Sequence, residues 1–192
     1  MVERFQGKYR IASTRLPNWN YAADGAYFVT ICTHNRLHFF GDVINSQVQL
    51  SVIGKIADQF WADIPNHFAD VYLDAYVIMP NHVHGILIID RSHNYHTPLP
   101  PTHVETLHAT SLPPNMSNIS PKTNSLGAII RSYKSAVTRW SRQNHFDNFA
   151  WQPRFYEHII RNDSSMHRIR NYIINNPAKW QEDKHNLVNL WM

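Results

Sequence analysis

Three stretches of the chain are almost continuously apolar and rich in the β-branched and aromatic residues that favour strands. They cover residues 26–33, 71–79 and 82–89. Only Pro80-Asn81, a pair typical of a turn, separates the last two, so they are predicted to be neighbours in one sheet. A shorter run over residues 47–50 predicts a further short strand.

Apolar residues three and four positions apart predict amphipathic helices that lie on this sheet. The first is expected over residues 51–68, and the second begins after Ser125, a good N-cap. A third follows the capping cluster Asn162-Asp163-Ser164 and stops before Pro177, which cannot continue a helix. The apolar stripes are Ile53, Ile56, Ala57, Phe60, Trp61 and Ile64; Leu126, Ile129, Ile130, Tyr133, Val137 and Trp140; and Met166, Ile169 and Ile173.

Two segments fall outside this periodic pattern. Residues 91–124 contain six prolines, many Ser, Thr and Asn residues and no apolar period, which predicts a mobile insertion. Their four histidines hint at metal binding, but the spacing is irregular and the flexible-loop interpretation carries more weight. Residues 1–24 are basic and predict a loose N-terminal arm. We therefore expect a single domain over residues 25–192, with the insertion inside it.

The composition narrows the class of protein. The chain has 192 residues, 43% of them hydrophobic, and Cys32 is its only cysteine, which excludes an intrachain disulfide. No apolar run approaches the roughly 20 residues of a membrane span, and the N-terminus lacks a secretory signal. We therefore expect a cytoplasmic protein with no membrane partner. A net charge of +4 favours a polyanionic partner without proving one.

Candidate chemistry begins with His82 and His84, which lie two residues apart on the predicted strand over residues 82–89. Side chains at i and i+2 point to the same face of a sheet, so both imidazoles can reach one cation. The alternative interpretation is that each is a neutral core histidine with one hydrogen-bonded nitrogen. Two imidazoles leave a divalent ion under-coordinated, so a metal site needs further ligands.

The last predicted helix offers such a ligand. Tyr172 and Asn176 are four residues apart and share a helical face. If that face packs over the histidine strand, the Asn176 side-chain oxygen can be a third ligand, and the open positions suit Mg²⁺ or Mn²⁺ bound to a phosphodiester. Tyr172 then points its phenol at the phosphorus. The alternative is that the tyrosine only packs on the helix and that the asparagine only ends it before a proline.

Five blocks of the sequence carry a family resemblance. The segment from Tyr76 to Gly85, YVIMPNHVHG, resembles the HUH motif (His, hydrophobic, His) of the single-strand tyrosine transposases and, closely, that of the REP-associated tyrosine transposases. The other blocks similar to this family are GAYFVTICT at 25–33, SYKSAV at 132–137, the run from Trp151 to Arg161, and YIINNP at 172–177. They follow the family's order over most of the chain.

The resemblance implies an α+β, ferredoxin-like fold with a central antiparallel sheet and helices packed on it. It also implies a divalent metal, Mg²⁺ or Mn²⁺, held by His82 and His84, with Asn176 where related transposases often have Gln. Tyr172 would be the nucleophile that cleaves and rejoins single-stranded or hairpin DNA through a 5′-phosphotyrosine intermediate. Related transposases often dimerise, so a homodimer is a further expectation. The cations assigned to DNA are Lys8, Arg10, Arg36, Arg131, Lys134 and Arg168.

The sequence leaves the nucleophile and the class of DNA-binding protein open. Tyr156, in the Phe-Tyr-Glu-His block, is a second candidate nucleophile, and Tyr172 is preferred because only it has a helical partner placed to share a metal. An HUH replication initiator or relaxase would share the chemistry and differ in its target. A non-catalytic protein that binds hairpin or single-stranded DNA would need only the basic and aromatic side chains.

Overall fold

The computed structural model describes residues 19–92 and 124–182 of the chain. Lys8 and Arg10, most of the expected N-terminal arm and most of the expected mobile insertion lie outside these described residues. Within the two described ranges, no helix combines the length and the apolar composition needed to cross a membrane.

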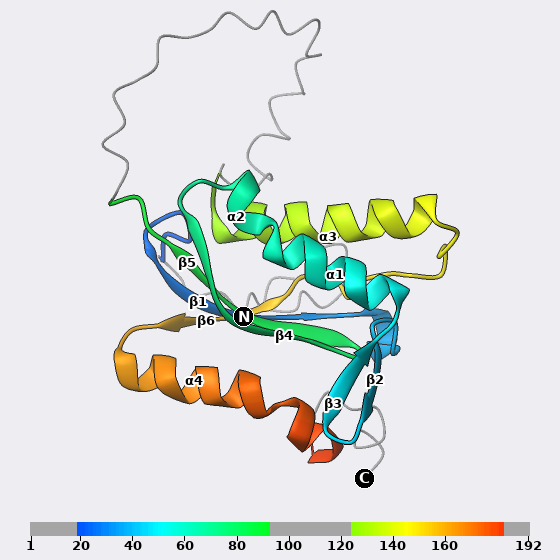
Figure 1. The fold of residues 1–192 in the computed structure, drawn as a ribbon. Coiled ribbons are helices and arrows are strands. Elements are labelled where there is room, and N and C mark those ends of the chain that lie inside the picture. The colour runs from blue at the N-terminus through cyan, green and yellow to red at the C-terminus, as the bar shows by residue number, and fades with distance from the viewer. Residues whose placement is uncertain (1–18, 93–123, 183–192) are drawn as a thin grey trace, which may run out of the picture.

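Four strands form the central sheet in the order β4-β5-β1-β6, and every neighbouring pair is antiparallel (Figure 1). The strands are β1 (Gly25–Cys32), β4 (Val71–Met79), β5 (His82–Ile89) and β6 (Tyr156–Ile160), and a separate hairpin consists of β2 (Gly41–Ile44) and β3 (Gln47–Leu50). In chain order, the strands of the central sheet lie second, third, first, fourth, which is the ferredoxin-like arrangement. The predicted fold class is confirmed.

Helices cover both faces of this sheet (Figure 1). On one face lie α1 (Val52–Ala62), α2 (Ile64–His67) and α3 (Leu126–Gln143), and on the other lies α4 (Asp163–Asn175). Two short 3₁₀ helices, η1 (His34–Arg36) and η2 (Pro177–Glu182), complete the elements of the described ranges. The helix α4 is therefore the element that lies over the face of the sheet opposite α1 and α3.

The helices begin at polar caps, two of which, Ser125 and Asn162, are predicted from the sequence. The side chains of Ser51, Ser125 and Asn162 accept hydrogen bonds from backbone N–H groups in the first turns of α1, α3 and α4. The single helix expected over residues 51–68 is wrong, because α1 ends at Ala62 and α2 is a separate turn. Pro65 has no N–H to donate to the carbonyl four residues earlier, so the helix cannot run on through it.

Alternation along β5 decides which side chains face which helices. Val83 joins the main core beneath α1 and α3, whereas Ile86 packs on the other face against Ile173 of α4. Residues two positions apart on a strand point to the same face, so even-numbered residues of β5 share one face and odd-numbered residues share the other. His82 and His84 are even-numbered, like Ile86, so both imidazoles lie on the face of the sheet that α4 covers.

The last residues of the expected N-terminal arm pack on the domain. Trp19 and Tyr21 contact the main core, and Trp19 Nε1 donates to the hydroxyl of Tyr27 at 3.3 Å. These contacts place ordered structure several residues before Gly25, where β1 begins.

Gly85 is a point of close contact between the sheet and α1. A Cβ atom at this position would lie 2.3 Å from Cζ2 of Trp61, which is fully buried. We expect Gly85→Ala to destabilise the fold by about 1–3 kcal/mol or more, because the indole ring has little room to move. Equilibrium urea unfolding measures this, with Gly25→Ala as the control, since its nearest contact would be 3.3 Å. Equal losses of stability in the two variants would contradict the prediction.

Candidate functional site

His82 and His84 lie side by side on β5, beneath α4. Their ring centroids are 4.3 Å apart, and both side chains are buried. The two-residue spacing predicts this shared face, and the fold places both rings on the side of the sheet that carries the last helix. A buried pair of imidazoles can hold one cation only if the ring nitrogens are correctly oriented.

Each imidazole is held at Nδ1 by a neighbouring polar side chain. His82 Nδ1 lies 2.8 Å from Oδ1 of Asn81, and His84 Nδ1 lies 2.9 Å from Oγ1 of Thr30. The Asn81 amide is itself oriented, because its Nδ2 donates to the carbonyl of Arg36 at 3.0 Å. An amide oxygen can only accept, so Nδ1 of His82 donates in this contact, and in the neutral imidazole Nε2 then carries the lone pair. That tautomer is the one required of a ligand or a proton acceptor at Nε2.

Tyr172 lies on α4 over the second of these imidazoles. Its hydroxyl is 3.2 Å from Nε2 of His84, and its ring meets Phe28 edge-on with the centroids 6.1 Å apart. The side chain is 41% exposed, so a ligand can reach the hydroxyl from solvent. The phenol, the imidazole and the Thr30 hydroxyl form a chain of polar contacts. A nucleophile, a base and an orienting group have this arrangement in enzymes that use covalent catalysis.

Tyr156, the other tyrosine proposed as nucleophile, lies on the edge strand β6. It pairs with Thr30 across the sheet, so its side chain points to the same face as His84. Of the two tyrosines, Tyr172 is the one whose hydroxyl contacts a histidine in the part of the chain that the structure describes. The geometry favours Tyr172.

A cavity of about 680 Å³ opens beside the phenol on the α4 side of the sheet. Asn176, one helical turn after Tyr172, is buried and lines this cavity. Two cations, Arg168 and Lys179, and one carboxylate, that of Glu182, line it too. The excess of positive charge suits an anionic ligand such as a phosphate group.

Arg170 holds α4 to the edge strand β4. Its guanidinium donates twice to the carboxylate of Asp74, at 2.7 Å through Nε and at 2.6 Å through Nη2. These hydrogen bonds lower the pKa of Asp74 below its ordinary value. Beneath the helix, Ile173 is fully buried against Ile86 and Ile160. An ion pair and an apolar contact therefore set the position of the phenol over the sheet.

We expect Asp74→Asn to loosen α4 and to leave the core intact. The amide has the size of the carboxylate but no charge, and it offers the guanidinium one acceptor oxygen in place of two. Because the folded-state pKa of Asp74 is lowered, the wild-type contact contributes stability above the ordinary carboxyl pKa and loses it as the pH falls through the lowered value. Amide hydrogen exchange in α4 should rise several-fold in the variant at pH 7, and in the wild type only in that acidic range.

The control for this experiment is Asp63→Asn, which removes a carboxylate between α1 and α2 on the opposite face of the sheet. It should leave exchange in α4 unchanged. Exchange in α4 that is the same in Asp74→Asn and in the wild type at pH 7 would show that Arg170 does not hold the helix.

The three residues expected to hold a metal would suit a transition-metal ion better than Mg²⁺. His82 and His84 offer imidazole nitrogens, and Asn176 offers an amide oxygen. Over residues 19–92 and 124–182, no three His, Cys, Asp or Glu side chains form a cluster that could hold a metal, so an amide is needed to complete a protein site there. Imidazole is a better ligand for transition ions than for Mg²⁺, so Mn²⁺ fits this set more closely.

The cations expected to bind DNA divide between the two faces of the sheet. Arg168 lines the cavity beside Tyr172, whereas Arg131 and Lys134 belong to α3 on the opposite face. Arg36 ends η1, next to the turn that supports the histidines. The helix-borne cations therefore cannot all contact the same stretch of DNA near the phenol.

Sequence reasoning missed the groups that orient this site. Thr30 lies opposite His84 in the pairing of β1 with β5, but strand register cannot be read from a single sequence. Asn81 is predicted only as a turn residue. In the structure its side chain contacts the imidazole of the next residue, and its position directly before His82 is the sequence feature that could have indicated this role. The ion pair between Asp74 and Arg170 joins positions 96 residues apart, and no local pattern predicts it.

Comparisons with known proteins relate the chain to a family by sequence and to a transposase by fold. No family model matches the chain. An uncharacterized protein of Haemophilus influenzae is 40% identical over 178 residues, which are 93% of this chain and 94% of that protein. Among solved structures, a REP-associated tyrosine transposase bound to a REP hairpin superposes with a TM-score of 0.53 at 18% identity, covering 91% of this chain and 77% of that one. A provisionally named transposase of Deinococcus radiodurans R1 has a TM-score of 0.40 at 15% identity, covering 85% and 97%.

The chain has a fold like that of a REP-associated tyrosine transposase, as the sequence resemblance predicted. With 40% identity over nearly the full length of both chains, it belongs to the same family as the Haemophilus influenzae protein. The activity has to be argued from the site.

Proposed function

We propose that the protein is a metal-dependent, transposase-like enzyme that cleaves and rejoins single-stranded or hairpin DNA through a covalent 5′-phosphotyrosine intermediate. The observation that carries this proposal is the 3.2 Å contact between the Tyr172 hydroxyl and Nε2 of His84. The phenol, an oriented imidazole and two cations line one cavity. Support for DNA as the substrate comes from the structural neighbour, a transposase bound to a REP hairpin.

In the proposed cleavage, the Tyr172 oxygen attacks a phosphorus atom of the DNA backbone. A bond forms between the phenol oxygen and phosphorus, and the bond between phosphorus and the 3′ oxygen breaks. The phenol loses its proton to solvent as it attacks, and the departing 3′ oxygen takes up a proton from solvent, so the step releases no net proton. The products are a 5′-phosphotyrosine and a free 3′-hydroxyl.

The residues around Tyr172 prepare the phenol and hold the phosphate. A phenol is a weak nucleophile while it is protonated, with a reference pKa of about 10. Thr30 holds the His84 imidazole beneath the hydroxyl, so the group next to the reacting oxygen is fixed before substrate arrives. Arg168 and Lys179 would hold the non-bridging oxygens of the phosphate through charge-assisted hydrogen bonds.

His82, His84 and Asn176 would hold a divalent metal, with Mn²⁺ preferred on the chemistry of the donor set. A metal bound there would polarise the phosphate and lower the cost of negative charge on its oxygens. Asn81 and Thr30 would then act as orienting groups, because they hold Nδ1 of each imidazole and direct Nε2 outward.

Rejoining is the reverse reaction with a different hydroxyl. The phosphotyrosine bond keeps the energy of the original phosphodiester, so a second DNA hydroxyl can attack it and reseal the strand without ATP. This property separates a transposase-like enzyme from a simple nuclease.

The cytoplasmic location and the homodimer stay predictions.

The proposal is tested by incubating labelled single strands and hairpins with the protein and with Mn²⁺, Mg²⁺ or EDTA. A metal-dependent, denaturant-resistant protein–DNA band is the expected result. A 3′-end label should stay with the protein and a 5′-end label should not, because the protein becomes attached to the 5′ end of the downstream fragment. Binding without such a band in any metal would favour the non-catalytic DNA-binding protein. An adduct that never transfers to an acceptor 3′-hydroxyl would contradict the rejoining step of the proposal.

A further inference from the structure

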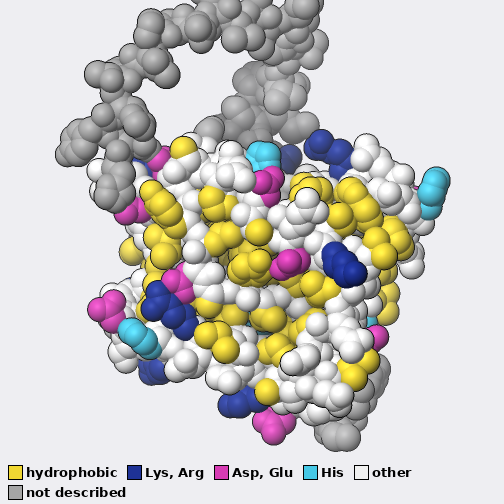
Figure 2. Space-filling view, viewed as in Figure 1, with side chains coloured by type: hydrophobic (Ala, Val, Ile, Leu, Met, Phe, Trp, Pro, Cys, Tyr) yellow, Lys and Arg dark blue, Asp and Glu magenta, His cyan; other side chains and the backbone are white. Residues whose placement is uncertain are grey.

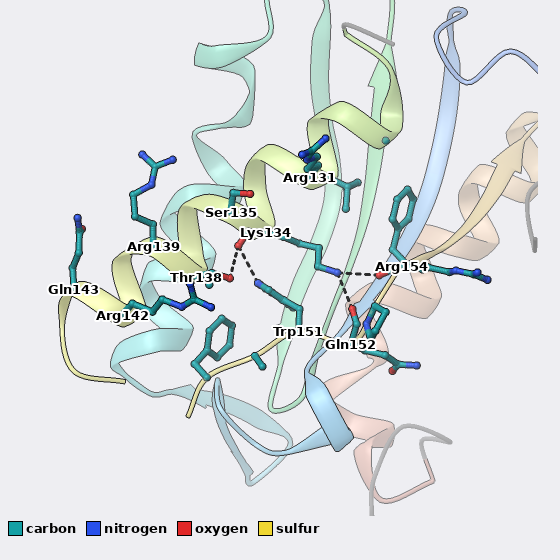
Figure 3. Close-up of a pocket in the computed structure, with 16 residues that line it drawn as sticks. Arg131, Lys134, Ser135, Thr138, Arg139, Arg142, Gln143, Trp151, Gln152 and Arg154 are labelled. Carbon is teal, nitrogen blue, oxygen red and sulfur yellow. Dashed lines mark hydrogen bonds between the residues drawn. The ribbon is translucent and has the colours of Figure 1, made fainter. Parts of the chain in front are cut away.

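A second cavity lies beside α3 (Figure 3), on the opposite face of the sheet from α4, which carries Tyr172 (Figure 1). Its volume is about 830 Å³. One wall is α3, and the other is the segment of residues 149–155 that leads into β6. We call this cavity the α3 groove. It shares no lining residue with the cavity beside Tyr172, so it is a separate site.

The α3 groove is lined by positively charged side chains. Five cations line it and no Asp or Glu does, whereas the whole chain has a net charge of only +4. Arg131, Arg139 and Arg142 follow one another along the exposed side of α3, and Arg154 stands on the facing wall (Figure 3). A cationic groove without an acidic side chain attracts a polyanion.

The face of the molecule over α1 and β4 is different. Figure 2 shows hydrophobic side chains across its middle and only scattered Lys and Arg side chains. Two of the exposed apolar side chains are Val52 at the start of α1 and Tyr72 on β4. This face therefore lacks a row of cations like the one that lines the groove.

Lys134, the fifth cation, builds the groove. Its Nζ donates to the carbonyls of Gln152 at 2.8 Å and of Arg154 at 3.0 Å. In the other direction, Trp151 Nε1 donates to the Lys134 carbonyl at 3.1 Å. Burial lowers the pKa of Lys134 to about 8. These bonds join the second wall to α3 (Figure 3), so the arginines line a groove that is formed before any ligand binds.

The arginine row has the length scale of a DNA backbone. Arg131 and Arg142 are eleven residues apart on α3, which is about 16 Å along a helix axis. One strand of a duplex carries a phosphate about every 3.4 Å of its axis, so the row spans roughly five phosphates. Arg154 adds a cation from the facing wall.

The aromatic side chains of the groove favour a duplex over an unpaired strand. Proteins that bind single strands stack the bases on exposed aromatic rings. In the α3 groove, Phe149 is buried and Trp151 and Phe155 are half-buried. The groove therefore offers charge without an exposed stacking surface, which suits phosphates whose bases are already paired.

We propose that the α3 groove binds the phosphate backbone of double-stranded DNA, on the face of the protein opposite Tyr172. This inference rests on the proposed function only in taking DNA as the ligand, and it requires no cleavage. A duplex in the groove and a single strand at the phenol would contact different faces of one domain. Contacts to phosphates carry no direct sequence information, so binding in the groove is expected to be independent of sequence.

The double variant Arg139→Gln/Arg142→Gln tests the groove. Both side chains are exposed, and glutamine favours a helix about as well as arginine, so the fold should persist, which circular dichroism checks. The probe is a blunt, fluorescent DNA duplex, titrated at several salt concentrations. Losing two phosphate contacts should reduce the slope of log K against log salt by about 1.8 and weaken binding by one to two orders of magnitude near 0.1 M salt.

Lys55→Glu is the matched control, because it changes the net charge by the same two units from an exposed position on α1 outside the groove. An equal loss of affinity in the control would show that net charge alone binds the duplex, and unchanged affinity in the arginine variant would also overturn the proposal. Cleavage is read out separately, as the adduct with an unstructured single strand. The arginine variant should retain that adduct, and a wild type that makes no adduct but binds duplex through these arginines would refute only the proposed catalysis.

Discussion

Tyr172→Phe is expected to form no denaturant-resistant adduct with DNA under conditions in which the wild-type protein does. The substitution removes the oxygen that would bond to phosphorus and keeps the ring that meets Phe28 edge-on. The side chain is partly exposed, so losing its hydroxyl should change the free energy of unfolding by about 1 kcal/mol or less. Activity would then be lost from a protein that still folds and still binds DNA. Gel analysis of the adduct and urea unfolding measure the two quantities.

Tyr156→Phe is the matched control for that experiment. This tyrosine is 51% exposed on β6 and points to the same face of the sheet as His84. Its variant should form the adduct at the wild-type level. An adduct that persists in Tyr172→Phe and disappears in Tyr156→Phe would reassign the nucleophile. Loss of the adduct in both variants would mean that the two tyrosines act together. The geometry around His84 does not predict that result.

Two strands at the candidate site could be predicted because their sequences are almost continuously apolar, although only β5 is buried along nearly its whole length. The expected stretches over residues 71–79 and 82–89 coincide with β4 (Val71–Met79) and β5 (His82–Ile89). β6 (Tyr156–Ile160) was not predicted as a strand. It is a short edge strand in which exposed and partly buried residues alternate, so its apolar signal is weak.

The same contrast holds within the site. The shared face of His82 and His84 follows from the two-residue period of a strand, which is a local property. The contact between Thr30 and His84 joins residues 54 positions apart and depends on the register of β1 against β5. The position of Tyr172 over His84 spans 88 positions and depends on how α4 docks. Neither the strand register nor the docking of α4 can be read from local periodicity.

For Lys134, the sequence identifies a cation on the helix but does not determine which groups its side chain contacts. The helical pattern places it near the polar side of α3 and assigns it to DNA together with Arg131. In the structure its ammonium is directed to the carbonyls of Gln152 and Arg154, whereas Arg131 is exposed. The loop follows α3 closely in the sequence. The direction of the long, flexible lysine side chain nevertheless depends on the carbonyl acceptors that the folded loop presents.

Removing the divalent metal is expected to abolish the adduct and to leave DNA binding in place. In the proposed site, the metal would sit among His82, His84 and Asn176, whereas the cations that bind phosphates are separate from these ligands. Protein treated with EDTA should regain activity when Mn²⁺ or Mg²⁺ is added. Mn²⁺ should restore more of it, because two of the three proposed protein ligands are imidazoles.

His82→Gln separates metal binding from the other roles of the site. His84 contacts the Tyr172 hydroxyl directly, so a change there would also act through the phenol. The His82 variant keeps a polar side chain in a fully buried position but lacks the imidazole Nε2. We expect adduct formation to fall by more than about a hundredfold, with a parallel loss of Mn²⁺ affinity in electron paramagnetic resonance titrations. Asn81→Ala, which removes only the orienting partner, should lose about 10–100-fold.

These measurements decide between two roles for the imidazole beneath the phenol. Nε2 of His84 can bind a metal or take the proton of Tyr172, but one lone pair cannot do both at once. If EDTA-treated wild type forms the adduct at the untreated rate, or if His82→Gln binds Mn²⁺ as tightly as the wild type, the metal proposal is wrong. Nε2 of His84, 3.2 Å from the hydroxyl, would then be assigned as the general base that activates the tyrosine.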